Sequence, residues 1–293
     1  MSEFFTRLGF GFLWLFQWLP MGSQAAIGNF IGWLAFHFAH RRKHIAQRNL
    51  ELCFPEKTPL EIQSLLRKNF QASSRAALEH GLLIWASEKR LKKLVRFEDE
   101  EHLRAHSGNP LILMAPHFVG LDMGGVRMTA HSRIASMYSR ARSAVVDRHL
   151  LRARSRFNQT LLVSKHDGIR PVIGAIRSGL PFYYLPDQDA GRSESIFVSF
   201  FGIPAATVPA LARLAKVAGA RVVPAVTRQL PGGKGYVMKF YPAWEDFPTS
   251  DIEADARRMN AFIEDRIREM PEQYLWTHRR FKTRPEGQPS LYD

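Results

Sequence analysis

Short apolar segments alternate with longer amphipathic segments along most of this chain. The apolar segments have the length and composition typical of β-strands: Leu111–Ala115, Ile134–Tyr138, Leu161–Ser164, Phe182–Leu185, Ile196–Phe201, Arg221–Thr227 and Tyr236–Tyr241. The amphipathic segments predict helices over residues 58–80, 119–130, 144–157, 168–178, 206–218 and 251–270. Strands that alternate with helices predict an α/β fold, in which a mixed, largely parallel sheet is flanked by helices.

Two local sequence signals refine this arrangement. Thr58 and Pro59, followed by Glu61, form a capping-box pattern that predicts the start of the first of these helices. The stretch 231–233, Pro-Gly-Gly, predicts a tight turn between the last two strands. We therefore expect the late part of the sheet to be antiparallel.

The N-terminal segment has a different pattern from the rest of the chain. It carries no Asp, Glu, Lys or Arg between Arg7 and Arg41, and Pro20 divides it into two apolar stretches. Each stretch is shorter than the ~20 residues of a membrane-spanning helix, although a single tilted span could use both. The basic residues that begin at Arg41 favour the cytoplasmic, anionic side of a membrane. We therefore expect residues 1–40 to be a hydrophobic membrane anchor and residues 41–293 to be one catalytic domain.

Two other interpretations of this N-terminal segment are open. It could be a cleaved signal peptide with its cleavage site at residues 23–25, but Arg7 is the only basic residue before the apolar stretch, which resumes after that site. It could also be a buried helical hairpin of a soluble protein. The tryptophans Trp14, Trp18 and Trp33 favour the anchor, because an indole suits the half-hydrated headgroup level of a membrane.

Composition narrows the class of protein further. The chain has 293 residues, of which 45% are hydrophobic and 23% are charged, and these values exclude disordered, collagen-like and coiled-coil classes. Cys53 is the only cysteine, so a disulfide scaffold is excluded. The formal net charge of +14 indicates an anionic partner: nucleic acid, a membrane surface, or an acidic protein or substrate.

The first candidate for chemistry is His117, which follows the predicted strand Leu111–Ala115. Open α/β sheets place their sites at this end of a strand. Asp122 lies in the predicted first turn of the next helix, so its carboxylate could orient the imidazole and stabilise the imidazolium. No Gly-x-Ser-x-Gly motif accompanies the pair, so we expect His117 to act as a general base on a hydroxyl of the substrate. A purely structural histidine is the simpler alternative, because this spacing also occurs by chance.

A second acidic cluster, Asp187-Gln188-Asp189, follows the predicted strand Phe182–Leu185 and points to the same edge of the sheet. Taken alone, Asp-x-Asp is typical of metal–nucleotide sites in glycosyltransferases, because paired carboxylates bind Mg²⁺ or Mn²⁺. A membrane-associated glycosyltransferase is therefore the alternative function, and a turn with solvated carboxylates is the structural alternative. A non-catalytic membrane or nucleic-acid binder would explain the net charge but not the His–Asp spacing.

Arginines gather in and before the helix predicted over 144–157. Residues 139–156 contain six of them: Arg140, Arg142, Arg148, Arg152, Arg154 and Arg156. Arginine forks match phosphate oxygens two at a time, although a solvated helix face would explain most of these residues equally well. The C-terminal block 276–285 also mixes aromatic and basic residues, and we expect it to meet an anionic headgroup or to form a surface tail.

A metal site is not expected anywhere in the chain. His37, His40 and His44 share a helical spacing that could chelate a metal, but the basic residues between them would repel it.

Several of these blocks together resemble the bacterial lipid A late acyltransferases, the lauroyl and myristoyl transferases of lipopolysaccharide assembly. The blocks are the His117-x-x-x-x-Asp122 motif, the stretches 185–191 and 197–207, and the C-terminal block 276–285. Residues 49–56 also match, so the resemblance covers nearly the whole chain.

The resemblance implies a glycerolipid-acyltransferase-like fold, attachment to the cell inner membrane and an active site on its cytoplasmic side. It implies transfer of a fatty acyl chain, lauroyl or similar, from acyl carrier protein to a hydroxyl of an anionic, Kdo-bearing lipid A precursor. No cofactor and no nucleic-acid partner are expected.

For individual residues, the resemblance implies that His117 and Asp122 are the catalytic pair and that Asp187 is the family's second acidic position. Gln188 beside it is expected to bind substrate. Arg154 matches the family's essential arginine. Upstream of it, Tyr138-Ser139-Arg140 departs from the family's usual Tyr-Arg pairing, so Arg140 is the alternative for that role. Backbone N–H groups of residues 118–121, or an arginine, are expected to hold the oxyanion.

Overall fold

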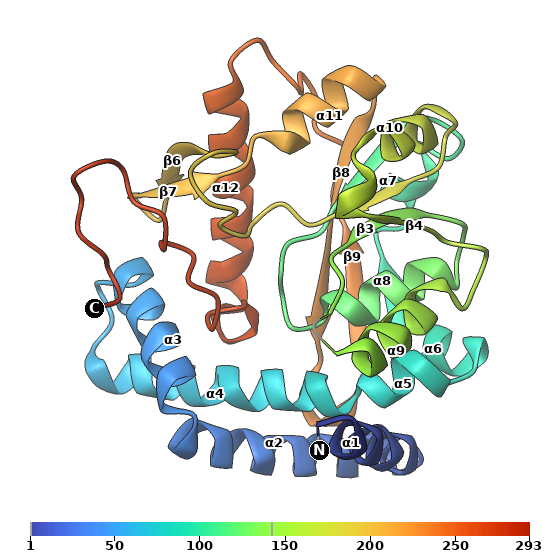
Figure 1. The fold of residues 1–293 in the computed structure, drawn as a ribbon, viewed down its shortest axis with the longest axis vertical. Helices are drawn as coiled ribbons and strands as arrows, with labels where there is room; N and C mark the ends of the chain where they lie inside the picture. The colour runs from blue at the N-terminus through green and yellow to red at the C-terminus, as the bar shows by residue number, and fades with distance from the viewer. Residues whose placement is uncertain (1, 142) are drawn as a thin grey trace.

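A seven-stranded sheet forms the centre of the computed structural model, which describes residues 2–141 and 143–293 (Figure 1). Arg142, one of the arginines noted above, lies outside the described residues. The strands are β1 (Val95–Glu98), β2 (Leu111–Met114), β3 (Ala135–Tyr138), β4 (Leu161–Ser164), β5 (Phe182–Tyr184), β8 (Arg221–Gln229) and β9 (Tyr236–Phe240).

The sheet is mixed and largely parallel, as predicted. The strand order is β1-β9-β8-β2-β5-β3-β4. Strands β8, β2, β5, β3 and β4 run parallel to one another, and β9 pairs antiparallel with β8 across the turn at residues 231–233. Strand β1, which the sequence pattern did not reveal, adds to the edge of β9 in parallel.

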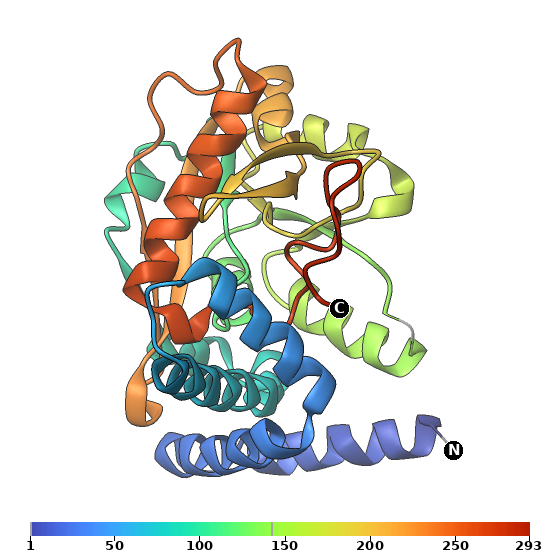
Figure 2. The same ribbon diagram turned by 90° about the vertical axis from the view of Figure 1, so that its left-hand side faces the viewer.

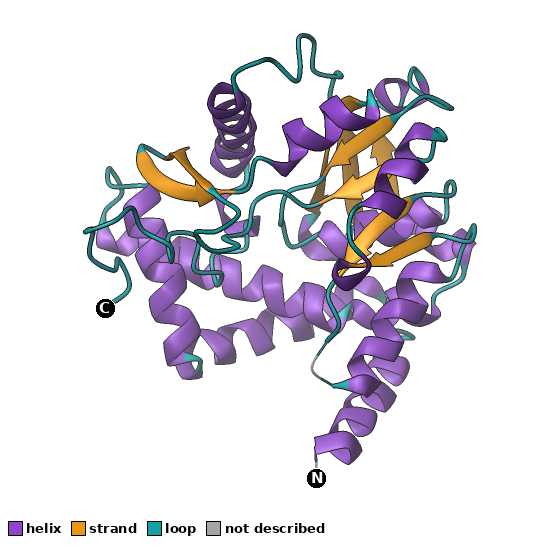
Figure 3. Ribbon diagram, turned by 45° about the horizontal axis from the view of Figure 1, so that its top comes forward, coloured by secondary structure: helices purple, strands orange, loops and turns teal. Residues whose placement is uncertain are grey.

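Helices cover both faces of the sheet (Figure 3). One face packs against α5 (His80–Trp85), α6 (Glu88–Leu94), α8 (Leu121–Thr129) and α9 (Ala144–Ser155). The core on the other face includes side chains of α10 (Arg170–Arg177), α11 (Ala210–Ala218) and α12 (Ile252–Glu269), and it continues to α3 (His40–Cys53) and α4 (Pro59–Leu78). A short helix, α7 (Glu101–Arg104), follows β1.

Strand β2 shows why the sheet needs two helical layers. Its four side chains are fully buried, with Leu111 and Leu113 in one core and Ile112 and Met114 in the other. Successive side chains of a strand point to opposite faces, so a continuous apolar run requires cover on both sides.

Two expectations about the second half of the chain are wrong. Strand β6 (Ile196–Phe200) does not join the main sheet, because it pairs with β7 (Ile203–Thr207) in a separate antiparallel ribbon. The helix predicted from residue 206 begins only at Ala210, since residues 206 and 207 belong to β7.

The C-terminal block, residues 276–285, does not form the expected surface tail or headgroup contact, because part of it is buried. Trp276 and Phe281 are buried in the core, and the buried Arg280 donates to the Ala206 carbonyl at 2.7 Å. The side chain of Asn49 donates to the Trp276 carbonyl at 2.7 Å. The block is therefore part of the packed domain, because its aromatic rings fill the core while its arginine bonds to the backbone.

The N-terminal segment forms two helices, α1 (Ser2–Phe16) and α2 (Met21–Phe38), which lie along one edge of the molecule (Figure 2). One side of α2 packs closely on α4: a Cβ atom on Gly32 would lie 2.4 Å from the Cα atom of Gln71. The helices are separate and half exposed, so neither a single tilted span nor a fully buried hairpin occurs. Over the described residues, none of the helices has the length and hydrophobicity that crossing a membrane requires.

Candidate active site

His117 and Asp187 meet at the carboxyl ends of two neighbouring parallel strands, β2 and β5. Asp187, whose side chain is 1% exposed, accepts hydrogen bonds from Nδ1 of the His117 ring at 2.7 Å and from the His117 backbone N–H at 3.0 Å. A carboxylate only accepts, so Nδ1 carries the proton and Nε2 is the ring nitrogen that is free to take one. Among the described residues, Nε2 of His117 has no hydrogen-bond partner.

The pKa values of this pair follow from their contact. Burial by itself lowers the pKa of His117, but the charge and hydrogen bond of Asp187 outweigh it and raise that pKa above its usual value. Burial by itself raises the pKa of Asp187, but the charge and hydrogen bonds of His117 bring it below its usual value. Asp187 is therefore a carboxylate at neutral pH, as the orienting partner of a general base should be.

Asp122 does not have the expected contact with His117. It lies in the first turn of α8, where its Oδ1 accepts from Nη2 of Arg154 at 3.1 Å and its Oδ2 lies 3.4 Å from Nε2 of His80. Within the described chain, no hydrogen bond joins Asp122 to His117. This corrects the expected pairing: Asp187 orients the imidazole, because the first turn of α8 directs Asp122 toward α9 and the α4–α5 junction.

The ionisation of Asp122 follows from its two cationic neighbours. Burial raises the pKa of Asp122, but the hydrogen bond from His80 and the charge of Arg154 lower it far more. Asp122 is therefore a carboxylate at neutral pH. The sequence carries no signal for His80, because the residue lies in a helical segment well before the motif and reaches Asp122 only through the tertiary structure.

Gly120, just before α8, and Gly124, within it, allow α8 to pack directly on β8. A Cβ atom on Gly120 would lie 2.5 Å from the carbonyl oxygen of Thr227, and one on Gly124 would lie 2.0 Å from its hydroxyl. The absence of a side chain at these two positions thus fixes the direction in which α8 leaves the strand.

The expected oxyanion site in this loop is largely occupied by the chain itself. The backbone N–H groups of Phe118, Val119 and Leu121 already donate to the carbonyls of Pro116, Gln273 and Phe118. The arginine alternative is better placed, because Arg154 lines the same cavity as His117.

The structure distinguishes the arginines from one another. Arg154 is half buried on Asp122, whereas Arg148 and Arg152 of the same helix are exposed. Arg156 donates to the backbone carbonyl of Leu83 at 2.7 Å. Arg140 is exposed and makes no hydrogen bond or ion pair with another described residue. Of the two candidates for the essential arginine, the structure brings only Arg154 to the site.

A cavity of about 700 Å³ opens beside this cluster. Its polar lining includes His117, Asp122, Arg154, Lys165, Gln188, Asp189 and Glu194. Its apolar lining includes Val126, Ile134, Met137, Leu162, Ile169, Phe182, Leu185, Val208 and Leu214. The cavity is therefore amphipathic, with the acid–base and cationic groups beside a chamber of aliphatic and aromatic side chains, and it has the size of a typical ligand site.

The two carboxylates of the Asp-x-Asp motif are bound within the chain. Asp187 accepts from His117, and Asp189 accepts from the backbone N–H and hydroxyl of Thr283 and from the N–H of Gly191. Asp189 thus links the C-terminal block to the loop after β5 by hydrogen bonds. These contacts explain both carboxylates of the motif without a metal ion. Gln188, between them, is exposed on the wall of the cavity.

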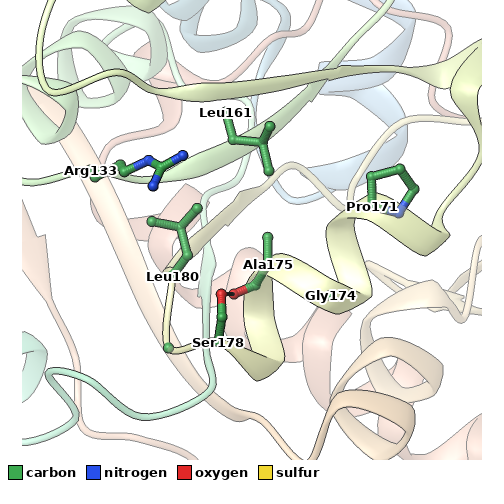
Figure 4. Close-up of a pocket in the computed structure, with 8 residues that line it drawn as sticks. Arg133, Leu161, Pro171, Gly174, Ala175, Ser178 and Leu180 are labelled. Atoms are coloured by element: carbon green, nitrogen blue, oxygen red, sulfur yellow. Dashed lines mark hydrogen bonds between the residues drawn. The ribbon is translucent and has the colours of Figure 1, made fainter.

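A smaller hollow of about 280 Å³ lies beside α10 (Figure 4). Leu161, Pro171 and Leu180 line it together with Arg133, and Ser178 donates there to the Ala175 carbonyl at 2.7 Å. No histidine or carboxylate is among its lining residues. The acid–base chemistry therefore belongs to the larger cavity.

Comparison with known proteins identifies the family of the chain. Residues 1–283 match the family described as bacterial lipid A biosynthesis acyltransferase. The chain is 36% identical to the lipid A biosynthesis lauroyltransferase of Escherichia coli over 290 residues, which are 98% of this chain and 94% of that protein. It is 34% identical to the palmitoleoyltransferase of E. coli with the same coverage, and 32% identical to its myristoyltransferase over 92% of this chain and 82% of that protein.

Among solved structures, the 1-acyl-sn-glycerophosphate acyltransferase PlsC of Thermotoga maritima aligns with a TM-score of 0.40 at 16% identity, covering 83% of this chain and 97% of that one. The sequence relationships are far closer and extend over the motif, the cavity and the C-terminal block. The alternative interpretation as a glycosyltransferase has no support among them. The chain belongs to the bacterial lipid A biosynthesis acyltransferase family and is an acyltransferase.

Proposed function

We propose that the chain transfers a fatty acyl chain from acyl carrier protein to a hydroxyl of a Kdo-bearing lipid A precursor, with His117 and Asp187 as the catalytic dyad. The observation that carries the proposal is the Nδ1 contact of His117 with Asp187 at 2.7 Å, which leaves Nε2 to act as a base in an amphipathic cavity.

In the proposed reaction, the acceptor hydroxyl oxygen attacks the thioester carbonyl while Nε2 of His117 takes the hydroxyl proton. The tetrahedral intermediate then expels the thiolate of the carrier, which takes the proton from the imidazolium. Asp187 holds the ring in the required tautomer and stabilises the imidazolium between these two transfers. Arg154 is the group best placed to stabilise the oxyanion or an acceptor phosphate.

The lining of the cavity supports a fatty acyl substrate. Aliphatic and aromatic side chains from β3, β4, β5, α10 and α11 form its apolar part, whereas the charged groups lie together near His117. An acyl chain gains free energy by leaving water, at roughly 0.8 kcal/mol per buried methylene. The thioester carbonyl at its end would then lie beside the base.

The charge of the chain supports an acidic donor carrier. The formal net charge is +14, and the exposed Arg148 and Arg152 lie on the same helix as Arg154, whose side chain reaches the cavity. Exposed basic residues on this helix would attract an acidic carrier protein toward the site.

The role of Arg154 can be tested by comparing two conservative substitutions on α9. Arg154→Lys is expected to lower kcat/KM more than about tenfold, because a compact ammonium cannot reproduce the fork that bonds Asp122 and reaches the cavity. Arg148→Lys, on the exposed side of the same helix, is the matched control and is expected to have little effect. Steady-state rates on a phosphorylated acceptor measure both, and equal, mild effects would refute the role of Arg154.

We further propose that α1 and α2 attach the protein to the cytoplasmic face of the cell inner membrane by lying in the interface. Both helices and the turn between them expose large apolar side chains: Phe4, Phe5, Leu8, Phe12, Trp14, Leu15, Trp18, Leu19, Ile27, Phe30, Trp33 and Phe38. Basic residues of α3, beginning at Arg41, follow directly. An apolar face beside basic residues is typical of helices that lie in an anionic membrane surface.

Replacing exposed side chains of this segment tests the attachment without unpacking α2 from α4. We expect the triple variant Leu8→Ser, Leu15→Ser and Trp18→Ser to bind anionic vesicles more than about tenfold less tightly, because each removes apolar surface that would enter the interface. Val217→Ser is the control, since Val217 is 50% exposed on α11, at the opposite end of the molecule in Figure 1. Unchanged sedimentation of the folded triple variant with vesicles would show that the attachment lies elsewhere.

The donor and acceptor are tested together with purified protein, lauroyl-acyl carrier protein and a Kdo-bearing lipid A precursor. The expected product is heavier by one acyl group in the mass spectrum, and free carrier thiol appears in equal amount. Transfer from acyl-coenzyme A in preference to the carrier, or to an acceptor without Kdo, would contradict the proposed substrates.

A further inference from the structure

His80 is held between two groups that only accept hydrogen bonds. Its Nδ1 lies 2.8 Å from the carbonyl oxygen of Ala76, one turn earlier, and its Nε2 lies 3.4 Å from Oδ2 of Asp122. A neutral imidazole has one N–H and one lone pair, so one of these contacts would be repulsive. Only the doubly protonated ring satisfies both, and the geometry therefore favours an imidazolium.

The imidazolium changes the charge of the cluster that faces the cavity. Asp122 carries one negative charge, which Arg154 alone would neutralise. With His80 protonated, two cations share one carboxylate, each on a different oxygen, and the cluster keeps one net positive charge. A neutral Asp122–Arg154 pair would offer little to a phosphate or an oxyanion, whereas a net cation attracts both.

We propose that His80, as an imidazolium, is a positioning residue for acyl transfer: it holds the second oxygen of Asp122, so that Arg154 keeps positive charge available to the substrate. The inference rests on the proposed function of this site. His80 acts through Asp122 and Arg154 and is not itself among the residues that line the cavity.

The surroundings of His80 set the direction of its pH dependence. The charged groups that face it are Asp122 from α8 and Arg154 from α9, while α4 contributes the Ala76 carbonyl. From α1, the carbonyl of Leu13 packs against Gly81, the next residue, without adding a charge. Burial lowers the pKa of His80, but Asp122 outweighs it and raises the pKa above the usual value. The charge is therefore fully present below the usual pKa of a histidine and is lost as the pH rises through the raised pKa.

Two substitutions separate the charge from the hydrogen bond. His80→Gln can still donate a hydrogen bond to Asp122 but has no charge, and His80→Ala has neither. His131→Gln is the matched control, because His131 is equally exposed and also faces a carboxylate, Glu100 at 3.8 Å, but lies outside the cavity. The assay uses full-length protein with lauroyl-acyl carrier protein and the Kdo-bearing acceptor.

We expect His80→Ala to lower kcat/KM on the order of 10²-fold at neutral pH and His80→Gln to lower it about tenfold, with the control unchanged. The unchanged enzyme should lose activity on the alkaline side as His80 loses its proton. His80→Gln should lack this alkaline fall. Full rescue by glutamine, with an alkaline fall like that of the unchanged enzyme, would overturn the proposal, because the hydrogen bond alone would then suffice.

A spectroscopic measurement determines the protonation state of His80 without an activity assay. In protein labelled with ¹⁵N-histidine, the signals of His80 are those absent from His80→Gln, and those of His117, whose pKa is also raised, are absent from His117→Ala. The His80 ring should remain doubly protonated above the pH at which free imidazole titrates. A neutral His80 at pH 7 would overturn the proposal even if His80→Gln were too unstable to assay. Failure of the unchanged enzyme to transfer the acyl group would instead contradict the proposed function and leave this readout to judge His80.

Discussion

Replacing His117 by alanine is expected to lower the rate of acyl transfer by about 10²–10⁴-fold, the range typical of general base catalysis. The substitution removes Nε2, the ring nitrogen that Asp187 leaves free to take the acceptor proton. Binding should change much less than the rate, because the rest of the cavity lining, including Arg154, is unchanged. Single-turnover rates with the acyl-carrier thioester measure the loss directly.

The control for this experiment is His131→Ala. His131 follows the C-terminal end of α8 and is not among the residues that line the cavity. The rate of this variant should equal that of the unchanged enzyme. Thermal melting of both variants tests whether they fold. A folded His117→Ala variant with near-normal transfer would refute the assignment of the base.

Replacing Asp187 by asparagine is expected to have the second-largest effect, again on the order of 10²–10⁴-fold. Asp187 accepts from both the ring and the backbone N–H of His117. An asparagine oxygen in the place of Oδ1 could still accept from the ring, but its amide would then donate toward the His117 backbone N–H where Oδ2 now accepts. The imidazole would therefore be held less firmly. The variant also loses the negative charge that stabilises the imidazolium.

The pH profile distinguishes this catalytic role from a structural one. Asp187 raises the pKa of His117, so the unchanged enzyme should lose activity, as the pH falls, at a higher pH than a free imidazole would dictate. Without the carboxylate, the pKa of His117 falls, and the acid limb of kcat/KM in Asp187→Asn should move to lower pH. A severe loss of rate with an unmoved acid limb would argue that Asp187 only supports the loop.

Asp122→Asn gives a useful contrast with Asp187→Asn. Asp122 bonds Arg154 and His80 and makes no hydrogen bond to His117 within the described residues. The two aspartates therefore serve different parts of the site in this structure. In the proposed mechanism, Asp187 orients the base, and Asp122 holds the cation that faces the cavity.

The sequence by itself determined much of the architecture. The alternation of apolar strands with amphipathic helices predicted an α/β sheet, and strand β4 begins and ends where its apolar run does. The capping box at Thr58 and Glu61 forms as predicted, with Glu61 accepting from the Thr58 backbone N–H at 2.8 Å. These features can be predicted from the sequence because each depends on residues only a few positions apart along the chain.

The sequence also identified the family and placed His117, Asp122 and Asp187 near one site, whereas Arg154 was implied only by the family resemblance. The sequence could do so because the carboxyl ends of parallel strands meet at one edge of a sheet, so residues that follow β2 and β5 are brought together. This argument predicts which side chains lie at one edge of the sheet, but it does not predict which of them form hydrogen bonds with one another.

Only the tertiary structure decided which groups pair. Five residues of spacing suggested that Asp122 orients His117, whereas the buried carboxylate of Asp187, which is distant in sequence, takes that hydrogen bond. His80 comes to Asp122 from the α4–α5 junction, and no local pattern marks it. The same holds for the C-terminal block, whose basic and aromatic composition suggested a surface but whose rings lie in the core. Pairing and burial depend on which segments pack together in space, and short-range spacing and composition carry no information about those contacts.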